Sequence, residues 1–105
     1  MFNYFALFME YLTVELGLSQ NTKIAYERDL RLLQKSLRLA SQEELLLVTR
    51  KELLGYLSQL KAEGKSASTI ARKLASIKAF YRFLTAERYI KHDPACLLYT
   101  SDAAD

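Results

Sequence analysis

The sequence has few of the residues that form turns, cross-links and metal sites. It contains one Cys, one His, one Pro, three Gly and no Trp in 105 residues. A single cysteine excludes a disulfide framework, and Cys96 and His92 alone cannot form a Cys/His zinc site. So little Gly and Pro disfavours a sandwich or barrel with many tight turns, and favours long helices joined by short loops.

The sequence also lacks a long hydrophobic run. No apolar stretch reaches the roughly 20 residues that a membrane-spanning helix needs. The apolar segment 1–9 contains no Lys or Arg, whereas a secretory signal begins with a basic region, and Glu10 and Glu15 come after it. These features argue against a secretory signal. We therefore expect no membrane association and a reducing, cytoplasmic location. Half of the residues are nevertheless apolar, and a chain of this length suffices for one hydrophobic core.

The charges are distributed unevenly along the chain. The net charge is +3, but residues 1–20 carry two Glu and no basic residue, and residues 93–105 carry three Asp and no basic residue. All fifteen Lys and Arg therefore lie in the middle of the chain, against seven acidic residues, which gives +8. Such a block is often only a solvated surface, but it also raises the expectation of a polyanionic partner such as nucleic acid.

Apolar spacing and capping signals predict four helices. An apolar face that includes Phe5 and Phe8 precedes a stop at Gly17, and Ser19 is an N-cap for a second helix. Ser41 with Glu44, and Thr49 with Glu52, each have the spacing of a capping box, and Ser66 or Ser68 would cap the last helix. The second helix has an apolar arc at Tyr26, Leu30, Leu33 and Leu37, and basic residues opposite it at Arg28, Arg31 and Lys35.

The last helix has an apolar stripe and an opposite face of mostly small residues. The stripe is Ile70, Leu74, Ile77, Tyr81 and Leu84, and the opposite face is Ser68, Thr69, Arg72, Ala75, Ser76, Ala79 and Phe83. Small residues there indicate that another helix or a phosphate backbone comes close. We expect Asp93-Pro94 to end the ordered region, which gives one helical domain over 1–92 and a tail over 93–105.

Three strings in this order resemble the N-terminal core-binding domain of tyrosine recombinases, the Xer-type and phage-integrase family. They are GLSQNTKIAYERDLRLL at 17–33, VTRKELLGYLSQL at 48–60 and STIARKLASIKAFYRF at 68–83, followed by Asp93-Pro94 where the family usually has Asn-Pro. The resemblance implies an all-α fold, a compact bundle of four to five helices that is SAM-like. It also implies one jaw of a clamp around duplex DNA, with the catalytic domain as the other jaw.

The resemblance implies DNA contacts from the second and the last helix. The matching residues of the second helix are Asn21, Thr22 and Lys23, with Tyr26 nearby and Arg28 on the basic face. Those of the last helix are Ser68, Thr69, Arg72, Lys73 and Ser76. Hydroxyl groups and amides at a helix N-terminus can donate to phosphates, and an arginine can reach either a phosphate or a guanine edge.

The residues do not predict catalysis. The family's tyrosine nucleophile and its phosphate-binding residues belong to the C-terminal domain, which we expect to be absent from these 105 residues. Tyr26, Tyr56 and Tyr81 lie on apolar stripes and are expected in the core, and no His-x-x-Arg set accompanies the others. No phosphate loop or metal-spaced carboxylate set occurs, so we expect no enzyme activity, cofactor or metal. The end of the tail, YTSDAAD, does not resemble the family's linker.

Two other interpretations stay open on the sequence alone. A helical protein-interaction bundle would use its small-residue face to pack on a partner helix, with a basic surface that is only solvated. A fragment of an enzyme, active only when completed, is compatible with a DNA-binding role. The resemblance also implies contact between the first helix and other recombinase protomers on DNA. Two uses of Phe2, Phe5 and Phe8 therefore stay open, contact with such a partner or packing in the domain's own core. Chromosome partition and DNA integration by a mobile element are equally compatible with the sequence.

Overall fold

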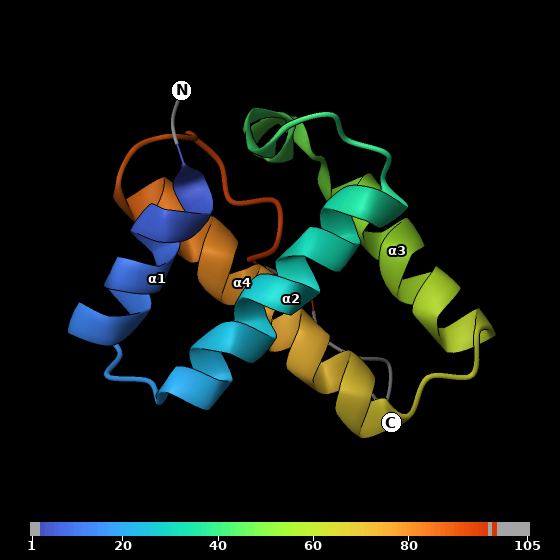
Figure 1. Ribbon diagram of the computed structural model, residues 1–105. Coiled ribbons are helices and arrows are strands. Elements are labelled where there is room, and N and C mark those ends of the chain that lie inside the picture. The colour runs from blue at the N-terminus through green and yellow to red at the C-terminus, as the bar shows by residue number, and fades with distance from the viewer. Residues whose placement is uncertain (1–2, 97, 99–105) are drawn as a thin grey trace.

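The computed structural model describes residues 3–96 and residue 98. The helices are α1 (Tyr4–Val14), α2 (Gln20–Ser36), α3 (Arg50–Ala62) and α4 (Ala67–Ala86), with a 3₁₀ helix η1 (Gln42–Leu47) between α2 and α3. In Figure 1, α2 passes across α4 in the middle of the molecule, with α1 on one side and α3 on the other. The described residues are thus all-helical, as the sequence predicts.

The helix starts follow the capping residues in the sequence. The Oγ atoms of Ser19 and Ser66 accept hydrogen bonds from the amides of Thr22 and Thr69, each at 3.2 Å. Thr49 forms the predicted capping box with Glu52 at the start of α3. The residue that caps the last helix is therefore Ser66 rather than Ser68. These local bonds satisfy amides that have no partner within the helix.

The capping box predicted for Ser41 and Glu44 does not form. Ser41 precedes η1 without a capping hydrogen bond from its side chain, and the Glu44 carboxylate accepts instead from the amide of Ala40 at 3.0 Å. The 3₁₀ geometry of η1 explains this difference, because it pairs residues three apart, and the Glu44 amide already donates to the Ser41 carbonyl at 3.2 Å. The amide that a capping box would pair with the Ser41 hydroxyl is therefore already in use.

The core lies where α4 meets the other helices. Phe5 and Phe8 of α1 are buried against Phe80 of α4, with ring centroids 5.8 Å and 5.2 Å away. This supports core packing as the use of these two residues, while Phe2 lies outside the described residues. Tyr56 and Tyr81 are buried as expected, and Tyr26 is half-buried.

The small-residue face of α4 is partly covered by the chain itself. Ser76 and Phe83 are fully buried, and Phe83 packs on Phe8 and Tyr11 of α1 at 5.6 Å and 5.2 Å between centroids. Ser68 and Arg72, nearer the start of α4, are exposed. Neighbouring helices therefore cover this face at Ser76 and Phe83, and the face stays open at Ser68 and Arg72.

The packed part of the chain continues beyond Asp93-Pro94. Ala95 and Leu98 are both buried and belong to the hydrophobic core. Asp93 accepts a hydrogen bond from the amide of Ala95 at 2.8 Å, which turns the chain back after α4. Ala95 and Leu98 thus contribute to the fold, and the tail sequence YTSDAAD lies outside the described residues.

Candidate nucleic-acid interface

The start of α2 carries the first group of predicted DNA contacts. Asn21 is exposed, whereas Thr22 and Lys23 are half-buried. The Thr22 hydroxyl accepts from Ser19 at 2.9 Å, and the Lys23 ammonium donates to the Thr13 hydroxyl of α1 at 2.6 Å. Lys23 therefore joins the start of α2 to the end of α1 as well as adding positive charge.

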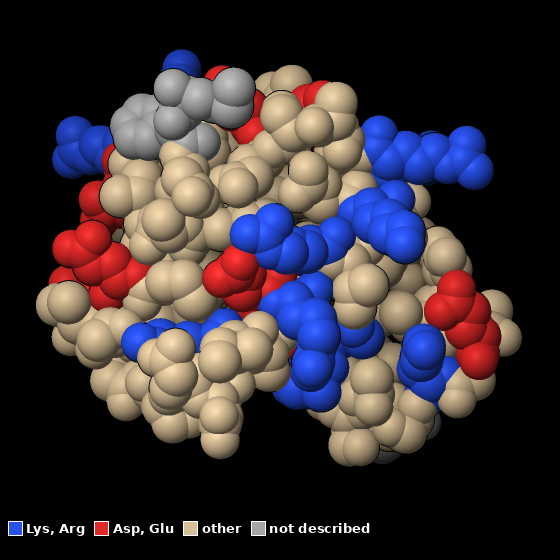
Figure 2. All heavy atoms as spheres, in the orientation of Figure 1, with Lys and Arg blue, Asp and Glu red and all other residues tan. Residues whose placement is uncertain are grey.

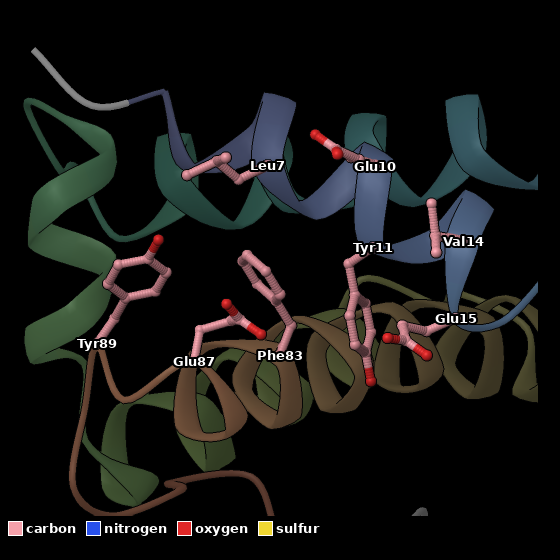
Figure 3. A pocket seen from close by; sticks show the side chains of 8 residues that line it. All are labelled: Leu7, Glu10, Tyr11, Val14, Glu15, Phe83, Glu87 and Tyr89. Atoms are coloured by element: carbon pink, nitrogen blue, oxygen red, sulfur yellow. The ribbon is translucent and has the colours of Figure 1, made fainter.

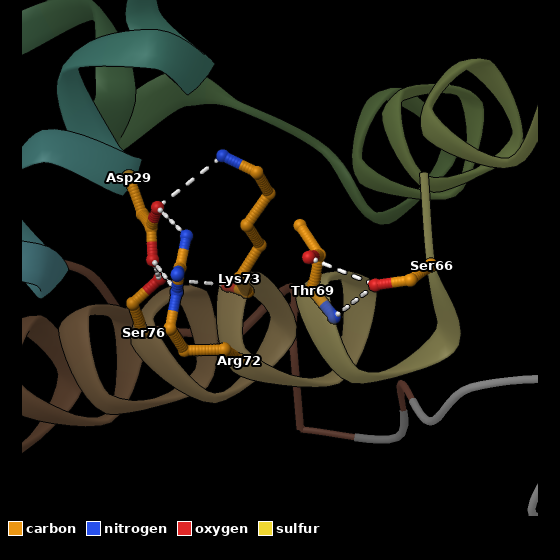
Figure 4. A network of polar contacts seen from close by, with 6 residues as sticks. All are labelled: Asp29, Ser66, Thr69, Arg72, Lys73 and Ser76. Atoms are coloured by element: carbon orange, nitrogen blue, oxygen red, sulfur yellow. Dashed lines mark hydrogen bonds and ion pairs between the residues drawn. The ribbon is translucent and has the colours of Figure 1, made fainter. Parts of the chain in front are cut away.

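The start of α4 carries the second group. The Ser66 hydroxyl accepts from the Thr69 amide and lies 3.0 Å from the Thr69 hydroxyl (Figure 4). The exposed Ser68 hydroxyl lies 3.3 Å from that of Ser66. In the view of Figure 1, α2 and α4 both begin at the lower edge of the molecule. The positive ends of two helix dipoles therefore lie along one edge, an arrangement that favours anions.

A buried carboxylate connects the two helices. Asp29 of α2 is 1% exposed and accepts from Arg72 Nε at 3.1 Å and from Arg72 Nη2 at 2.9 Å. Lys73 Nζ donates to Asp29 Oδ1 at 3.2 Å, and the Ser76 hydroxyl is 3.5 Å from Oδ2. Figure 4 shows the three side chains of α4 pointing toward Asp29. We call Asp29, Arg72, Lys73 and Ser76 the Asp29 cluster.

The members of the Asp29 cluster differ in their access to solvent. The Arg72 side chain is 41% exposed, whereas that of Lys73 is 7% exposed and Ser76 is fully buried. Ser76 also donates to the Lys73 carbonyl at 2.7 Å. The structure therefore differs from the sequence-based expectation for Lys73 and Ser76, because packing of α4 on α2 turns both toward Asp29. Arg72 is therefore the most exposed member of the cluster.

Basic side chains follow α2 on its outer side. Figure 2 shows Lys and Arg gathered over the middle of this face, where α2 crosses α4. An open hollow of about 400 Å³ runs along α2 and is lined by Ile24, Glu27, Arg28, Arg31, Leu32 and Lys35. Arg31 is paired with Glu27 at 2.7 Å and lies 5.0 Å from the Phe5 ring centroid, whereas Arg28 and Lys35 are exposed. The predicted contact Arg28 thus lies on an open basic surface.

A second hollow lies between α2, α3 and the start of α4. Its volume is about 390 Å³, and its lining is Leu32, Lys35, Ser36, Tyr56, Gln59, Leu60, Glu63, Lys65 and Lys73. Burial, followed by the negative charges of Asp29 and Glu63, raises the pKa of Tyr56 to about 12. Tyr56 therefore stays protonated at neutral pH and adds no negative charge to this basic hollow.

The other end of the molecule has the opposite charge. A hollow of about 230 Å³ between α1 and the end of α4 is lined by Leu7, Glu10, Tyr11, Val14, Glu15, Phe83, Glu87 and Tyr89 (Figure 3). Its three carboxylates would repel a polyanion. Acidic side chains thus line this hollow, whereas exposed basic side chains line the separate hollow along α2.

The part of the chain that the structure describes offers no metal site or membrane span. It contains no group of three or more His, Cys, Asp or Glu arranged to hold a metal ion. No helix among residues 3–96 is both long and apolar enough to cross a bilayer.

Asp29 is the functional candidate that the sequence interpretation missed. A signal was present, because Asp29 lies beside the apolar arc of α2, about 40° from Leu33 on the helical wheel, where a buried carboxylate needs a partner. The partner could not be read from spacing, because Arg72 is 43 positions away. Of the predicted residues, the structure brings Arg72, Lys73 and Ser76 together, and leaves Asn21, Arg28 and Ser68 exposed.

Comparison with known proteins identifies the domain. The family model for the phage integrase N-terminal SAM-like domain matches residues 5–88, which is most of the chain. The chain belongs to this family. The match confirms the resemblance carried by the three sequence strings, and the all-helical fold is that of a SAM-like domain. The matched segment belongs to the N-terminal domain of these recombinases rather than to their catalytic domain.

Curated relatives of this core-binding domain are bacterial tyrosine recombinases. The chain is 36% identical over 98 residues to tyrosine recombinase XerD of Listeria monocytogenes serotype 4b (strain F2365), covering 92% of the chain and 33% of that protein. It is 38% identical over 87 residues to tyrosine recombinase XerC of Listeria monocytogenes serotype 4a (strain HCC23), covering 83% and 29%. The chain thus spans about a third of the length of the curated relatives it matches. No solved structure matches it significantly.

Proposed function

We propose that this core-binding domain binds duplex DNA as one jaw of a tyrosine recombinase clamp, in DNA recombination and integration. The observation that carries the proposal is the exposed Arg72 guanidinium beside the basic surface of α2. Phosphate contacts would come from Asn21, Thr22, Lys23 and Arg28, and from Ser68, Thr69 and Arg72, with Tyr26 beside them. Lys73 and Ser76 act behind this surface rather than on it.

Family membership supports the same role. The relatives are named as tyrosine recombinases, whose reaction acts on DNA, and the chain matches them over the domain that carries these residues. The remaining steps of that reaction require a catalytic domain, so this domain alone is expected to bind and not to cut. Chromosomal or mobile-element DNA as the partner would place the protein in the cytoplasm, and other protomers would meet it on DNA.

The proposal is tested by the salt dependence of binding to a short fluorescently labelled duplex. Each phosphate neutralised should contribute a slope of about −0.9 to the plot of log affinity against log salt. Arg28→Gln should weaken binding and reduce this slope by about one phosphate equivalent. Lys91→Gln is the matched control, because it removes the same charge beyond the far end of α4, roughly 30 Å from the helix start. A slope of zero, or equal losses in both variants, would contradict the proposal.

A helical protein-interaction bundle is the second candidate, from a different functional class. Its specific support is the acidic hollow between α1 and α4, beside which Val14 is 71% exposed. The small-residue face supports it less, because α1 and α2 already cover Ser76 and Phe83. Size-exclusion chromatography with light scattering separates the two, since this candidate requires a stable oligomer without DNA.

A further inference from the structure

The Arg72 guanidinium is held on one edge and open on the other. Nε and Nη2 point at the two oxygens of Asp29, and Nη1 takes no part in these bonds. The side chain is 41% exposed, although the carboxylate that holds it is fully buried. An arginine fixed in this way has already lost the rotamer freedom that a free surface arginine loses when it binds a ligand.

Asp29 alone would cancel the charge of Arg72. Lys73 changes this balance, because its buried ammonium lies 3.2 Å from the same carboxylate oxygen that accepts from Arg72 Nη2. Two cations on one carboxylate leave a net positive charge, and the only exposed ionic member of the cluster is Arg72. The cluster therefore presents its surplus charge through Arg72.

We propose that Asp29 is a positioning residue that orients Arg72 for contact with DNA. In this proposal buried Lys73 offsets the negative charge of Asp29, so that the Asp29 cluster keeps a net positive charge at Arg72. This inference rests on the proposed function. It assigns a role in DNA binding to a negatively charged, solvent-inaccessible residue. Removing Asp29 would then weaken DNA binding even though it makes the domain more positive.

Asp29→Asn distinguishes positioning from simple electrostatics by the sign of its effect. The amide cannot accept from both Arg72 nitrogens through two oxygens, so the guanidinium is released. We expect affinity for duplex DNA to fall about two- to tenfold, the range for immobilising one long side chain. Electrostatics alone would instead make binding tighter. Glu63→Gln is the matched control, because it makes the same charge change at an exposed position that lines the basic hollow beside α4 and that accepts from the neutral Gln59 amide rather than from an arginine, so it should keep or increase affinity.

A second variant keeps the test valid if Asp29→Asn leaves Lys73 unpaired and the domain unfolds. Asp29→Asn combined with Lys73→Met removes one charge of each sign, so the net charge equals that of the unmodified protein and no buried ammonium lacks a partner. We expect the same two- to tenfold loss of affinity. Affinity equal to that of the unmodified protein would overturn the proposal.

A spectroscopic measurement on the unmodified, DNA-free protein provides a readout that needs no variant. The Nε–H signal of Arg72 should be protected from exchange and rigid, whereas that of exposed Arg28 should be exchange-broadened and mobile. Equal mobility of the two would overturn the proposal. Failure of the unmodified protein to bind any duplex at low salt would instead reject the proposed function, and would be recognised before any variant is compared.

Discussion

Arg72 and Asp29 are joined by two hydrogen bonds, from Nε at 3.1 Å and from Nη2 at 2.9 Å, across 43 positions of the sequence. The pair fixes how α4 lies on α2, because the carboxylate is buried at the place where the two helices cross (Figure 4). A bidentate arginine–carboxylate pair is directional, so it constrains both the position and the rotation of the helices. The same contact therefore contributes to the fold and to the proposed DNA surface.

Lys73→Glu is expected to destabilise the domain strongly. The substitution would place a second carboxylate beside buried Asp29, and the loss should be about 3–5 kcal/mol of unfolding free energy, as for other broken buried ion pairs. Urea unfolding measures it. Lys35→Glu makes the same charge change at an exposed position of α2 and should alter stability by about 0.5 kcal/mol or less. Similar losses in the two variants would show that Lys73 is not buried against Asp29.

Tyr81→Phe is expected to lower stability by about 1–3 kcal/mol. The Tyr81 hydroxyl donates to the Leu45 carbonyl at 2.7 Å in the core, and its removal leaves that carbonyl without this donor. Thermal unfolding is the measurement. Tyr11→Phe removes the same atom from a ring that lines an open hollow and should cost less. A larger loss of stability in Tyr11→Phe than in Tyr81→Phe would contradict the hydrogen bond from Tyr81 to Leu45.

Stability is expected to fall between about pH 10 and pH 12. Burial and then the charges of Asp29 and Glu63 raise the pKa of Tyr56 from 10.0 to about 12, so the folded state keeps a proton that the unfolded state has lost. The resulting stabilisation is fully present below pH 10 and disappears as the pH passes 12. Burial also raises the pKa of Tyr81, which acts in the same direction.

Tyr56→Phe isolates this contribution. Urea midpoints measured from pH 9 to pH 12 should fall less steeply in the variant, since one tyrosine no longer ionises on unfolding. The comparison removes effects that both proteins share, such as the titration of lysines. Parallel pH profiles for the two proteins would mean that Tyr56 titrates normally in the folded state.

Arg88→Gly is expected to stabilise the domain by about 0.5–1 kcal/mol. Arg88 follows α4 with a φ of 64°, a left-handed conformation that is unfavourable for residues with a Cβ atom and that glycine adopts freely. Gly64 follows α3 with a φ of 83°, so Gly64→Ala should have the opposite sign. Calorimetric midpoints of the two variants should therefore move in opposite directions. A shift of both in one direction would contradict the assigned backbone conformations.

Features encoded by neighbouring residues were predictable from the sequence. Ser19, Thr49 and Ser66 cap helices because each side chain bonds to an amide three residues away. The apolar spacing of α1 likewise placed Phe5 and Phe8 in the core. Such local relations depend on helix geometry alone, and this is why the number of helices and most of their starts could be anticipated.

Features that depend on distant residues were not predictable. The burial of Lys73 and Ser76 depends on how α4 is rotated against α2, and the helical wheel of α4 contains no information about Asp29. Ala95 and Leu98 follow Pro94, the only proline of the chain. The proline predicts the end of the ordered region, but both residues are buried in the core through contacts with distant parts of the chain. The sequence therefore predicted which two helices carry the candidate surface, but not which of their side chains are exposed to solvent.

The burial of Leu98 has a mechanical consequence. Because this side chain is 1% exposed within the core, the chain is anchored at Leu98 as well as by α4. A pulling force applied at Leu98 would therefore act directly on the core. A fragment ending at residue 92 would lack both Ala95 and Leu98, and truncating a buried leucine typically costs about 2–5 kcal/mol. The part of the chain that packs into the core therefore reaches Leu98, beyond the end of α4.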